Sequence, residues 1–239
     1  MSGHSKWSTI KHKKALIDAK RGKKFTKLIK EITVAARLGG GDPSGNPRLR
    51  LLLEKAKEIN MPLENATRAI KKGTGELPGQ AYEAQTYEGY GPENVALMID
   101  VLTDNKNKAI AELRHVFSRN GGRIADAGAV GWMFQRVGIV SGTGKTTEDT
   151  LLENLLDYEV IAISVHDGDT FEVICEPKAL EAIKETLTKK LGLHVEDAEL
   201  GWHAENKTTL NQEQAERVLE FLQAVEELDD VQDVYTNME

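Results

Sequence analysis

The sequence has few of the features that mark secreted, membrane-spanning or disulfide-stabilised proteins. Among its 239 residues there is one cysteine, Cys175, so no internal disulfide can form and the composition fits a reducing compartment. No apolar run reaches about 18 residues, which excludes a membrane-spanning helix, and the start of the chain has no apolar stretch of the signal-peptide type. A basic, acid-poor start also occurs in organellar transit peptides, but here the basic character continues into a patterned helix without a Ser-rich flank. We therefore expect a cytoplasmic protein.

The sequence also has no recognisable catalytic or metal-binding motif. None of the six histidines has a cysteine or histidine partner at a ligand spacing, and His4 and His12 lie among cations that would repel a metal ion. No nucleophile elbow, Cys–His pair or carboxylate pair stands out, and Asp100, Asp104 and Asp126 fit turns better than catalysis. We expect no enzyme activity, no metal and no cofactor.

One glycine-rich segment, Gly142–Thr146, resembles part of a phosphate-binding loop. Such a loop requires a glycine five positions before the Gly-Lys pair, because its length sets where the backbone amides point. Ile139 occupies that position, and Gly138 is one residue too far away. A turn between a strand and a helix is the favoured interpretation, and a nucleotide-hydrolysing enzyme is the alternative.

The net charge of −7 conceals two parts of opposite sign. Residues 1–75 carry 18 Lys/Arg and 6 Asp/Glu, whereas residues 76–239 carry 13 and 32, giving net charges of +12 and −19. This asymmetry predicts a polyanion-binding segment joined to a different kind of module.

The basic part is most concentrated at its start, where residues 1–30 contain ten Lys/Arg and one acid, Asp18. A phosphate backbone relieves the repulsion among such side chains and releases counterions, and Trp7 among them could stack on a base. The alternatives are a solvated helix face and, for Trp7, a core or hinge anchor. Acids are interspersed among the later members of the set, which weakens the prediction for them. The predicted nucleic-acid-binding residues are Lys6, Trp7, Lys11, Lys13, Lys14, Lys20, Arg21, Lys23, Lys24, Lys27, Lys30, Arg48, Arg50, Arg68, Lys71 and Lys72.

Periodicity predicts that this basic part is all-helical. Apolar residues between Gly22 and Leu38 recur on one face of a helix, with lysines on the opposite face, within a helix predicted over residues 8–38. Asn46-Pro47 predicts the start of a second helix, with Asn46 as its N-cap. A third helix is predicted from Leu63 to Lys72, closing at Gly73.

Beyond residue 80 the pattern alternates between strands and helices. A buried strand is predicted over 95–102, a helix over 107–118, an extended segment over 130–140 and a β-α-β-β-α-β order over 135–204, with a final helix and strand over 211–235. We predict an α+β multidomain fold with a helical basic domain (1–78), a discontinuous α/β domain (79–134 plus 205–239) and an inserted βαββαβ domain of the ferredoxin-like, split βαβ type (135–204).

The acidic α/β part is either a solvated surface or a docking surface for a basic partner, such as ribosomal or transcription proteins. Within it, Tyr87–Pro92 is the one aromatic cluster, and its two glycines and proline predict a shaped loop.

Several long segments, in the same order, resemble the YebC/PmpR family across essentially the whole chain. They are GHSKW (Gly3–Trp7), AKRGKKFTKL (Ala19–Leu28), GGGDPSGNPRLR (Gly39–Arg50), MPLENATRAIKKGTGE (Met61–Glu76), YEGYGP (Tyr87–Pro92) and TDNKNKAIAELRHVFSRNGG (Thr103–Gly122). The chain departs from the family pattern at Lys108-Ala109 and in Ala125–Val130, both in the second domain.

The resemblance implies three domains and a cytoplasmic, probable transcriptional regulator that binds DNA. Members also resemble a mitochondrial translational activator of cytochrome c oxidase, and some look like ribosome-associated factors that help elongation through difficult sequences. Neither activity involves known covalent chemistry. The basic positions inside matching motifs, which the resemblance carries over together with Trp7, are Lys6, Lys20, Arg21, Lys23, Lys27, Arg48, Arg50, Arg68 and Lys71.

We therefore expect a non-enzymatic nucleic-acid-binding regulator of gene expression. The resemblance favours a DNA-binding transcriptional regulator. The residues lean slightly towards ribosomal RNA and a translation factor, because no recognition helix carries side chains suited to base edges. A protein-interaction scaffold is a further alternative, and the sequence defines neither the oligomeric state nor a base preference.

Overall fold

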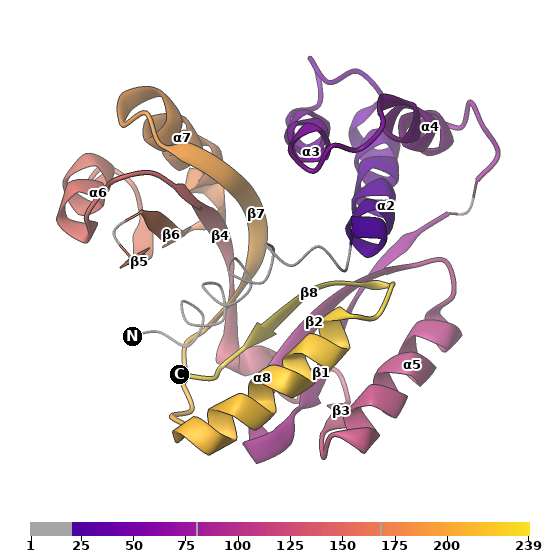
Figure 1. Cartoon of the computed structure of the whole chain (residues 1–239), viewed down its shortest axis with the longest axis vertical. Helices are drawn as coiled ribbons and strands as arrows, with labels where there is room; N and C mark the ends of the chain where they lie inside the picture. The colour runs from indigo at the N-terminus through magenta and orange to yellow at the C-terminus, as the bar shows by residue number, and fades with distance from the viewer. Residues whose placement is uncertain (1–20, 80, 168) are drawn as a thin grey trace.

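A helical N-terminal part is followed by two antiparallel sheets in the computed structural model, which describes residues 21–79, 81–167 and 169–239 (Figure 1). This arrangement confirms the predicted α+β class with a helical start. The second sheet and its helices are inserted in the chain between β3 and α8 of the first sheet.

The helical part consists of α2 (Arg21–Gly39), α3 (Pro47–Glu58) and α4 (Leu63–Thr74). Asn46 caps α3 as predicted, because its side chain accepts the N–H of Leu49 and Pro47 occupies the first helical turn. The Asn46 amide also donates to the carbonyls of Ala35 and Gly40, which ties α3 to the end of α2. The cap therefore fixes the angle between two helices as well as the start of one.

The α4 helix runs past the predicted stop at Gly73 to Thr74, and its C-cap is Gly75, which adopts a left-handed φ of 83°. Gly73 lies instead where α4 crosses α2. A Cβ atom at position 73 would lie 2.4 Å from the carbonyl oxygen of Thr33 and 2.8 Å from Cβ of Ala36. The glycine is needed for close helix packing and does not end the helix.

Replacing Gly73 with alanine is expected to destabilise the protein by about 1 kcal/mol. Overpacking costs about 1–3 kcal/mol, and the better helix propensity of alanine returns part of it. Urea unfolding measures the change. Gly45→Ala is the matched control, because its Cβ would approach nothing closer than 3.9 Å. A Gly73→Ala protein as stable as the wild type would contradict the packing argument.

The first sheet contains β1 (Glu83–Tyr90), β2 (Ala96–Thr103), β3 (Arg123–Ala125) and β8 (Val231–Thr236), in the order β3-β1-β2-β8. The helices α5 (Lys106–Arg119) and α8 (Gln212–Glu226) lie on one face of it (Figure 1). Their shared core includes Phe117 and Phe221, whose rings meet edge to face at 4.9 Å. Because β8 pairs with β2, the end of the chain returns to the first sheet.

The prediction of a shaped loop over Tyr87–Pro92 is wrong. Residues 87–90 are the end of β1, and the turn begins only at Gly91, followed by a short 3-10 helix, Pro92–Asn94. β1 has one buried residue, Gly89, so it has no apolar run to mark it as a strand. Its pairing with β2 on one side and β3 on the other stabilises it.

The second sheet contains β4 (Phe134–Thr143), β5 (Val160–His166), β6 (Thr170–Cys175) and β7 (His194–Ala204), in the order β5-β6-β4-β7. The helix α6 (Glu148–Leu155) connects β4 to β5. A 3-10 turn (Pro177–Ala179), α7 (Leu180–Glu185) and a π-helical segment (Thr186–Lys190) connect β6 to β7. This is the predicted βαββαβ order. Residues of β4 and β7, including Phe134 and Ala204, form a small core with Ala96, Met98 and Tyr235 of the first sheet.

Candidate nucleic-acid interface

Three lysines of α2 contact the C-terminal end of α8 in the first α/β unit or the turn that follows it. The ammonium groups of Lys23 and Lys27 donate to the carbonyls of Glu227 and Glu226 at 2.9 Å each, and Lys30 reaches the turn that follows. Positions 23, 27 and 30 share one face of a helix. Free carbonyls at a helix C-terminus attract cations, and the last turn of α8 has no basic residue of its own. The face of α2 predicted to grip phosphates therefore contacts a helix end.

The prediction that Lys30 binds nucleic acid is wrong, because its side chain is buried within the fold. Only 6% of Lys30 is exposed, and its ammonium forms a short ion pair with Asp230. It also donates to the carbonyls of Asp229 at 2.9 Å and Leu102 at 3.4 Å, so all three N–H groups are used. The Thr103 hydroxyl donates to the second oxygen of Asp230 at 2.9 Å. A phosphate cannot reach this ammonium without separating α2 from the first sheet.

Further cations of the helical part contact the α/β units. Lys55 of α3 pairs with Asp197 of β7 at 2.5 Å. Arg37, at the end of α2, donates to the Tyr82 carbonyl at 2.7 Å. These contacts hold α2 and α3 against both sheets. Part of the +12 charge of residues 1–75 is therefore neutralised within the fold.

Two predicted arginines have local partners but remain exposed. The guanidinium of Arg50 donates to the carbonyls of Pro43 and Ser44 at 3.1 and 3.0 Å, which holds the loop between α2 and α3. Arg68 forms an ion pair with Glu64, one turn earlier on α4, at 3.0 Å. A surface ion pair of this kind is worth about 0–1 kcal/mol, so Arg68 can exchange it for a phosphate at little cost.

Four exposed cations of α3 and α4 form no hydrogen bond or ion pair with any described residue through their side chains. They are Arg48, Lys57, Lys71 and Lys72. Lys57 is the one that the sequence analysis missed, because Glu54 and Glu58 lie beside it in the sequence. Together with the exposed Lys24, Arg50 and Arg68 they make up what we call the helical basic surface.

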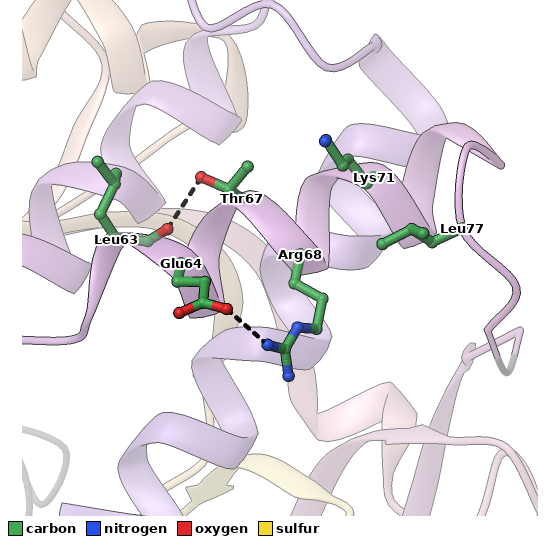
Figure 2. Close-up of a pocket in the computed structure, with 6 residues that line it drawn as sticks. All are labelled: Leu63, Glu64, Thr67, Arg68, Lys71 and Leu77. Carbon is green, nitrogen blue, oxygen red and sulfur yellow. Dashed lines mark hydrogen bonds and ion pairs between the residues drawn. The ribbon is translucent and has the colours of Figure 1, made fainter.

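The outer face of α4 combines this charge with exposed apolar groups (Figure 2). An open hollow of about 450 Å³ is lined by Leu63, Glu64, Thr67, Arg68, Lys71 and Leu77. Leu63 is 76% exposed. The Thr67 hydroxyl donates a hydrogen bond to the backbone carbonyl of Leu63 at 2.9 Å, so it does not point into the hollow. The hollow therefore offers cations beside leucine side chains.

Part of the predicted site lies before the first residue that the structure describes. Lys6, Trp7, Lys11, Lys13, Lys14 and Lys20 lie outside the described residues, and for Arg21 the structure describes only the backbone. Their assignment to the interface stays a prediction.

The glycine-rich Gly142–Thr146 segment contains the last two residues of β4, Gly142 and Thr143, and the turn that leads to α6. The Gly144 N–H donates to the Asp169 carbonyl at 2.8 Å, and the Thr147 side chain caps α6 by accepting from Thr150 N–H. Its geometry is that of a strand-to-helix turn.

In the described ranges, no group of three His, Cys, Asp or Glu residues is arranged to hold a metal ion. Burial raises the pKa of Cys175 to about 11, so this thiol stays protonated. None of the helices described in the structure is long and apolar enough to cross a membrane.

A charged helical unit joined to two α/β units is the architecture of a known family. The profile described as "TACO1/YebC protein N-terminal domain" matches residues 5–76, and that described as "TACO1/YebC second and third domain" matches residues 82–238. The chain belongs to the TACO1/YebC family.

Relatives of the family match over nearly their whole length. A protein from Desulfatibacillum aliphaticivorans is 53% identical over 99% of this chain and 96% of its own. One from Chlorobium luteolum is 50% identical over 100% and 96%. Both are named "Probable transcriptional regulatory protein". The crystal structure of a conserved hypothetical protein, Aq1575, from Aquifex aeolicus is 43% identical, with a TM-score of 0.85 over 94% of this chain and 93% of that one.

Proposed function

We propose that this protein is a non-enzymatic, nucleic-acid-binding regulator of gene expression in the cytoplasm, and specifically a DNA-binding transcriptional regulator. The names of its relatives support the regulatory role. The helical basic surface supports the nucleic-acid partner, and it is the observation that carries the proposal. Arg48, Lys57, Lys71 and Lys72 remain exposed after the fold has used Lys30 and Lys55 internally.

Exposed cations concentrated in one small helical unit are costly unless a polyanion neutralises them. Each phosphate contact releases counterions, so binding through this surface depends steeply on salt. Contacts of this kind position a protein on nucleic acid without reading its sequence. The proposal therefore predicts strong backbone binding, with sequence preference supplied by other groups.

Reversing the charge of Lys71 and Lys72 together is expected to weaken duplex DNA binding at least tenfold near physiological salt. Each lost phosphate contact also lowers the slope of log affinity against log salt by about 0.9. Fluorescence anisotropy with a labelled duplex over a salt series measures both quantities. The matched control is the Lys189→Glu, Lys190→Glu protein, which reverses an adjacent exposed pair in the acidic part. Equal losses in both proteins would mean that net charge, and not this surface, determines binding.

A translation factor that binds ribosomal RNA is the second candidate, and the hollow on α4 favours it. Leu63 and Leu77 beside Arg68 and Lys71 suit a surface made of RNA and protein better than a bare phosphate backbone. The acidic α/β units would then face basic ribosomal proteins.

Two assays separate these candidates. Cosedimentation with ribosomes that is lost in the Lys71→Glu, Lys72→Glu protein supports the translation factor. Sequence-dependent binding to duplex DNA that survives competitor DNA supports the transcriptional regulator. A chain that binds neither ribosomes nor DNA would refute the nucleic-acid proposal.

A further inference from the structure

The second sheet has an open edge at β5. This strand is the outermost in the order β5-β6-β4-β7, and no described strand pairs with the edge that faces away from β6. The Val165 N–H points out of the sheet at this edge, because it donates to the carboxylate of Glu148 at 3.2 Å. Alternate residues of an antiparallel strand turn their N–H and C=O groups to the same edge, so Ile163 presents its backbone there too. Such an edge can accept an added strand.

α6 places two exposed leucines beside this edge. Leu151 and Leu155 of α6 are buried in the core of the second sheet. Glu148, Leu152 and Leu156 follow one another every four residues, so they form one line along the helix. Leu152 is 52% and Leu156 is 72% exposed. Because Glu148 reaches the edge of β5, the line that it begins runs along that edge.

The two elements are matched in length and run in opposite directions. Glu148, at the start of α6, lies by Val165 near the end of β5, and a short turn leads from the end of α6 back to the start of β5. From Glu148 to Leu156 the helix rises about 12 Å, and from Val165 back to Ile161 the strand covers about 13 Å. α6 and β5 lie together at the side of the second sheet away from the helical part (Figure 1).

The surroundings of the edge are strongly acidic. Residues 146–177, which include α6, β5 and β6, carry nine Asp/Glu and no Lys/Arg. Glu153 is exposed on α6, and exposed acids stand at both ends of β5, with Glu159 directly before it and Asp167 directly after it. Glu159 pairs with Lys178 from outside this range. A second copy of this chain would bring the same charge to the edge, whereas a basic segment is attracted to it.

We propose that the open edge of β5 and the exposed leucines of α6 dock an extended, basic segment of a partner protein as an added strand. The inference goes beyond the proposed nucleic-acid contact and assigns a partner to the acidic α/β part. In this mode the backbone of the segment bonds to the edge, and side chains on one of its faces contact Leu152 and Leu156. A bulge at Ile161 and nearby charge protect the edge from aggregation, but protection does not require exposed leucines.

The test uses the full chain and a labelled peptide of about eight alternating lysines and valines with blocked ends, which is long enough for one strand. Fluorescence anisotropy is expected to show binding with a Kd below about 1 mM. The Leu152→Ala, Leu156→Ala protein is expected to bind about tenfold more weakly, because the peptide then covers less apolar surface. Leu200→Ala is the matched control, since Leu200 is 45% exposed on β7, at the other edge of the same sheet.

Charge reversal tests the choice of a basic partner. The Glu153→Lys, Asp157→Lys protein is expected to bind the peptide roughly fivefold more weakly at low salt, and the difference should shrink as salt is added. The Glu216→Lys, Glu220→Lys protein is the matched control, because it makes the same charge change at two exposed acids of α8. Equal losses in the two proteins would mean that net charge determines binding, and would overturn the site.

Methylation of the peptide backbone tests strand addition itself. Alternate N–H groups of a strand face opposite edges. Methylating the nitrogens of one set, either the lysines or the valines, is therefore expected to abolish binding, and methylating the other set to leave it. Equal effects of the two methylated peptides would contradict an added strand.

Two further results would overturn the inference. One is a peptide that does not bind to the wild type at all. The other is self-association of the chain in sedimentation velocity that the Leu152→Ala, Leu156→Ala protein loses, which would assign the surface to a second copy. The Lys71→Glu, Lys72→Glu protein is expected to bind the peptide like the wild type, so a failure of the nucleic-acid proposal leaves this inference unaffected.

Discussion

Replacing Lys30 with methionine is expected to lower the free energy of unfolding by about 3–5 kcal/mol, because it leaves Asp230 as an unpaired buried charge. Both side chains of this ion pair are almost completely buried where α2 meets the end of β2 and the turn before β8. Methionine retains the length and apolar stem of lysine. The decrease in the free energy of unfolding therefore measures the contribution of the Lys30 charge and its hydrogen bonds. Urea unfolding followed by circular dichroism measures it.

A double-mutant cycle identifies the partner. Asp230→Asn leaves Lys30 two backbone carbonyls, and the Lys30→Met, Asp230→Asn protein should lose much less than the sum of the single changes. Lys57→Met is the matched control, since Lys57 is an exposed lysine of α3 and is expected to change stability by less than about 0.5 kcal/mol. A Lys30→Met protein within about 1 kcal/mol of the wild type, with no coupling to Asp230, would contradict the arrangement.

The local elements of this fold could be predicted because their signals are local. The Asn46-Pro47 cap, the buried run that became β2 and the βαββαβ order all follow from residues close together in the sequence. β1 and the three-residue β3 could not be predicted in the same way. Their residues are mostly exposed or half-buried, and pairing with strands elsewhere in the chain stabilises them.

For the candidate site, the sequence predicts where the side chains lie on a helix but not which groups they contact. The spacing of Lys23, Lys27 and Lys30 correctly predicts one helix face, but not what the face contacts. The groups it meets lie 72 residues away at Leu102 and 199 to 204 residues away elsewhere, and most of them are backbone carbonyls, which have no signature in the sequence. A weak signal exists in α8, whose last turn has no cation to balance its free carbonyls. A basic helix face therefore predicts an acceptor, which can be a helix end as readily as a phosphate.

The same junction contains a carboxyl group whose ionisation opposes folding. Burial raises the pKa of Glu31 from 4.5 to about 7, and the neighbouring Asp233 and Asp197 raise it further against the opposing effect of Lys55 and Arg48. These groups come from α2, α3, β7 and β8, so the three parts of the chain meet around Glu31. For Lys55, burial opposes the charged form, but Asp197, Glu199 and Glu31 together raise its pKa.

Glu31→Gln is therefore expected to stabilise the protein by about 2 kcal/mol at pH 8, a value reduced from the full shift because the side chain keeps some contact with solvent. An acid whose folded pKa is raised binds its proton more tightly when folded. Its contribution to stability is present below the unfolded value of 4.5 and is lost as the pH rises to about 7. The difference between the variant and the wild type should thus be near zero at pH 4, grow up to pH 7 and stay constant above it.

Urea unfolding of both proteins across this pH range measures that difference, and subtraction removes the titrations that they share. Glu54→Gln is the matched control, because Glu54 is an exposed carboxylate of α3 outside the junction. The Gln variant loses the attraction to Lys55 as well as the repulsion from Asp197 and Asp233. The sign of the change in stability at pH 8 therefore shows whether the attraction or the unfavourable effects are larger. A variant that is less stable than the wild type at pH 8 would mean that the Lys55 pairing outweighs burial, and that Glu31 is ionised within the folded protein at neutral pH.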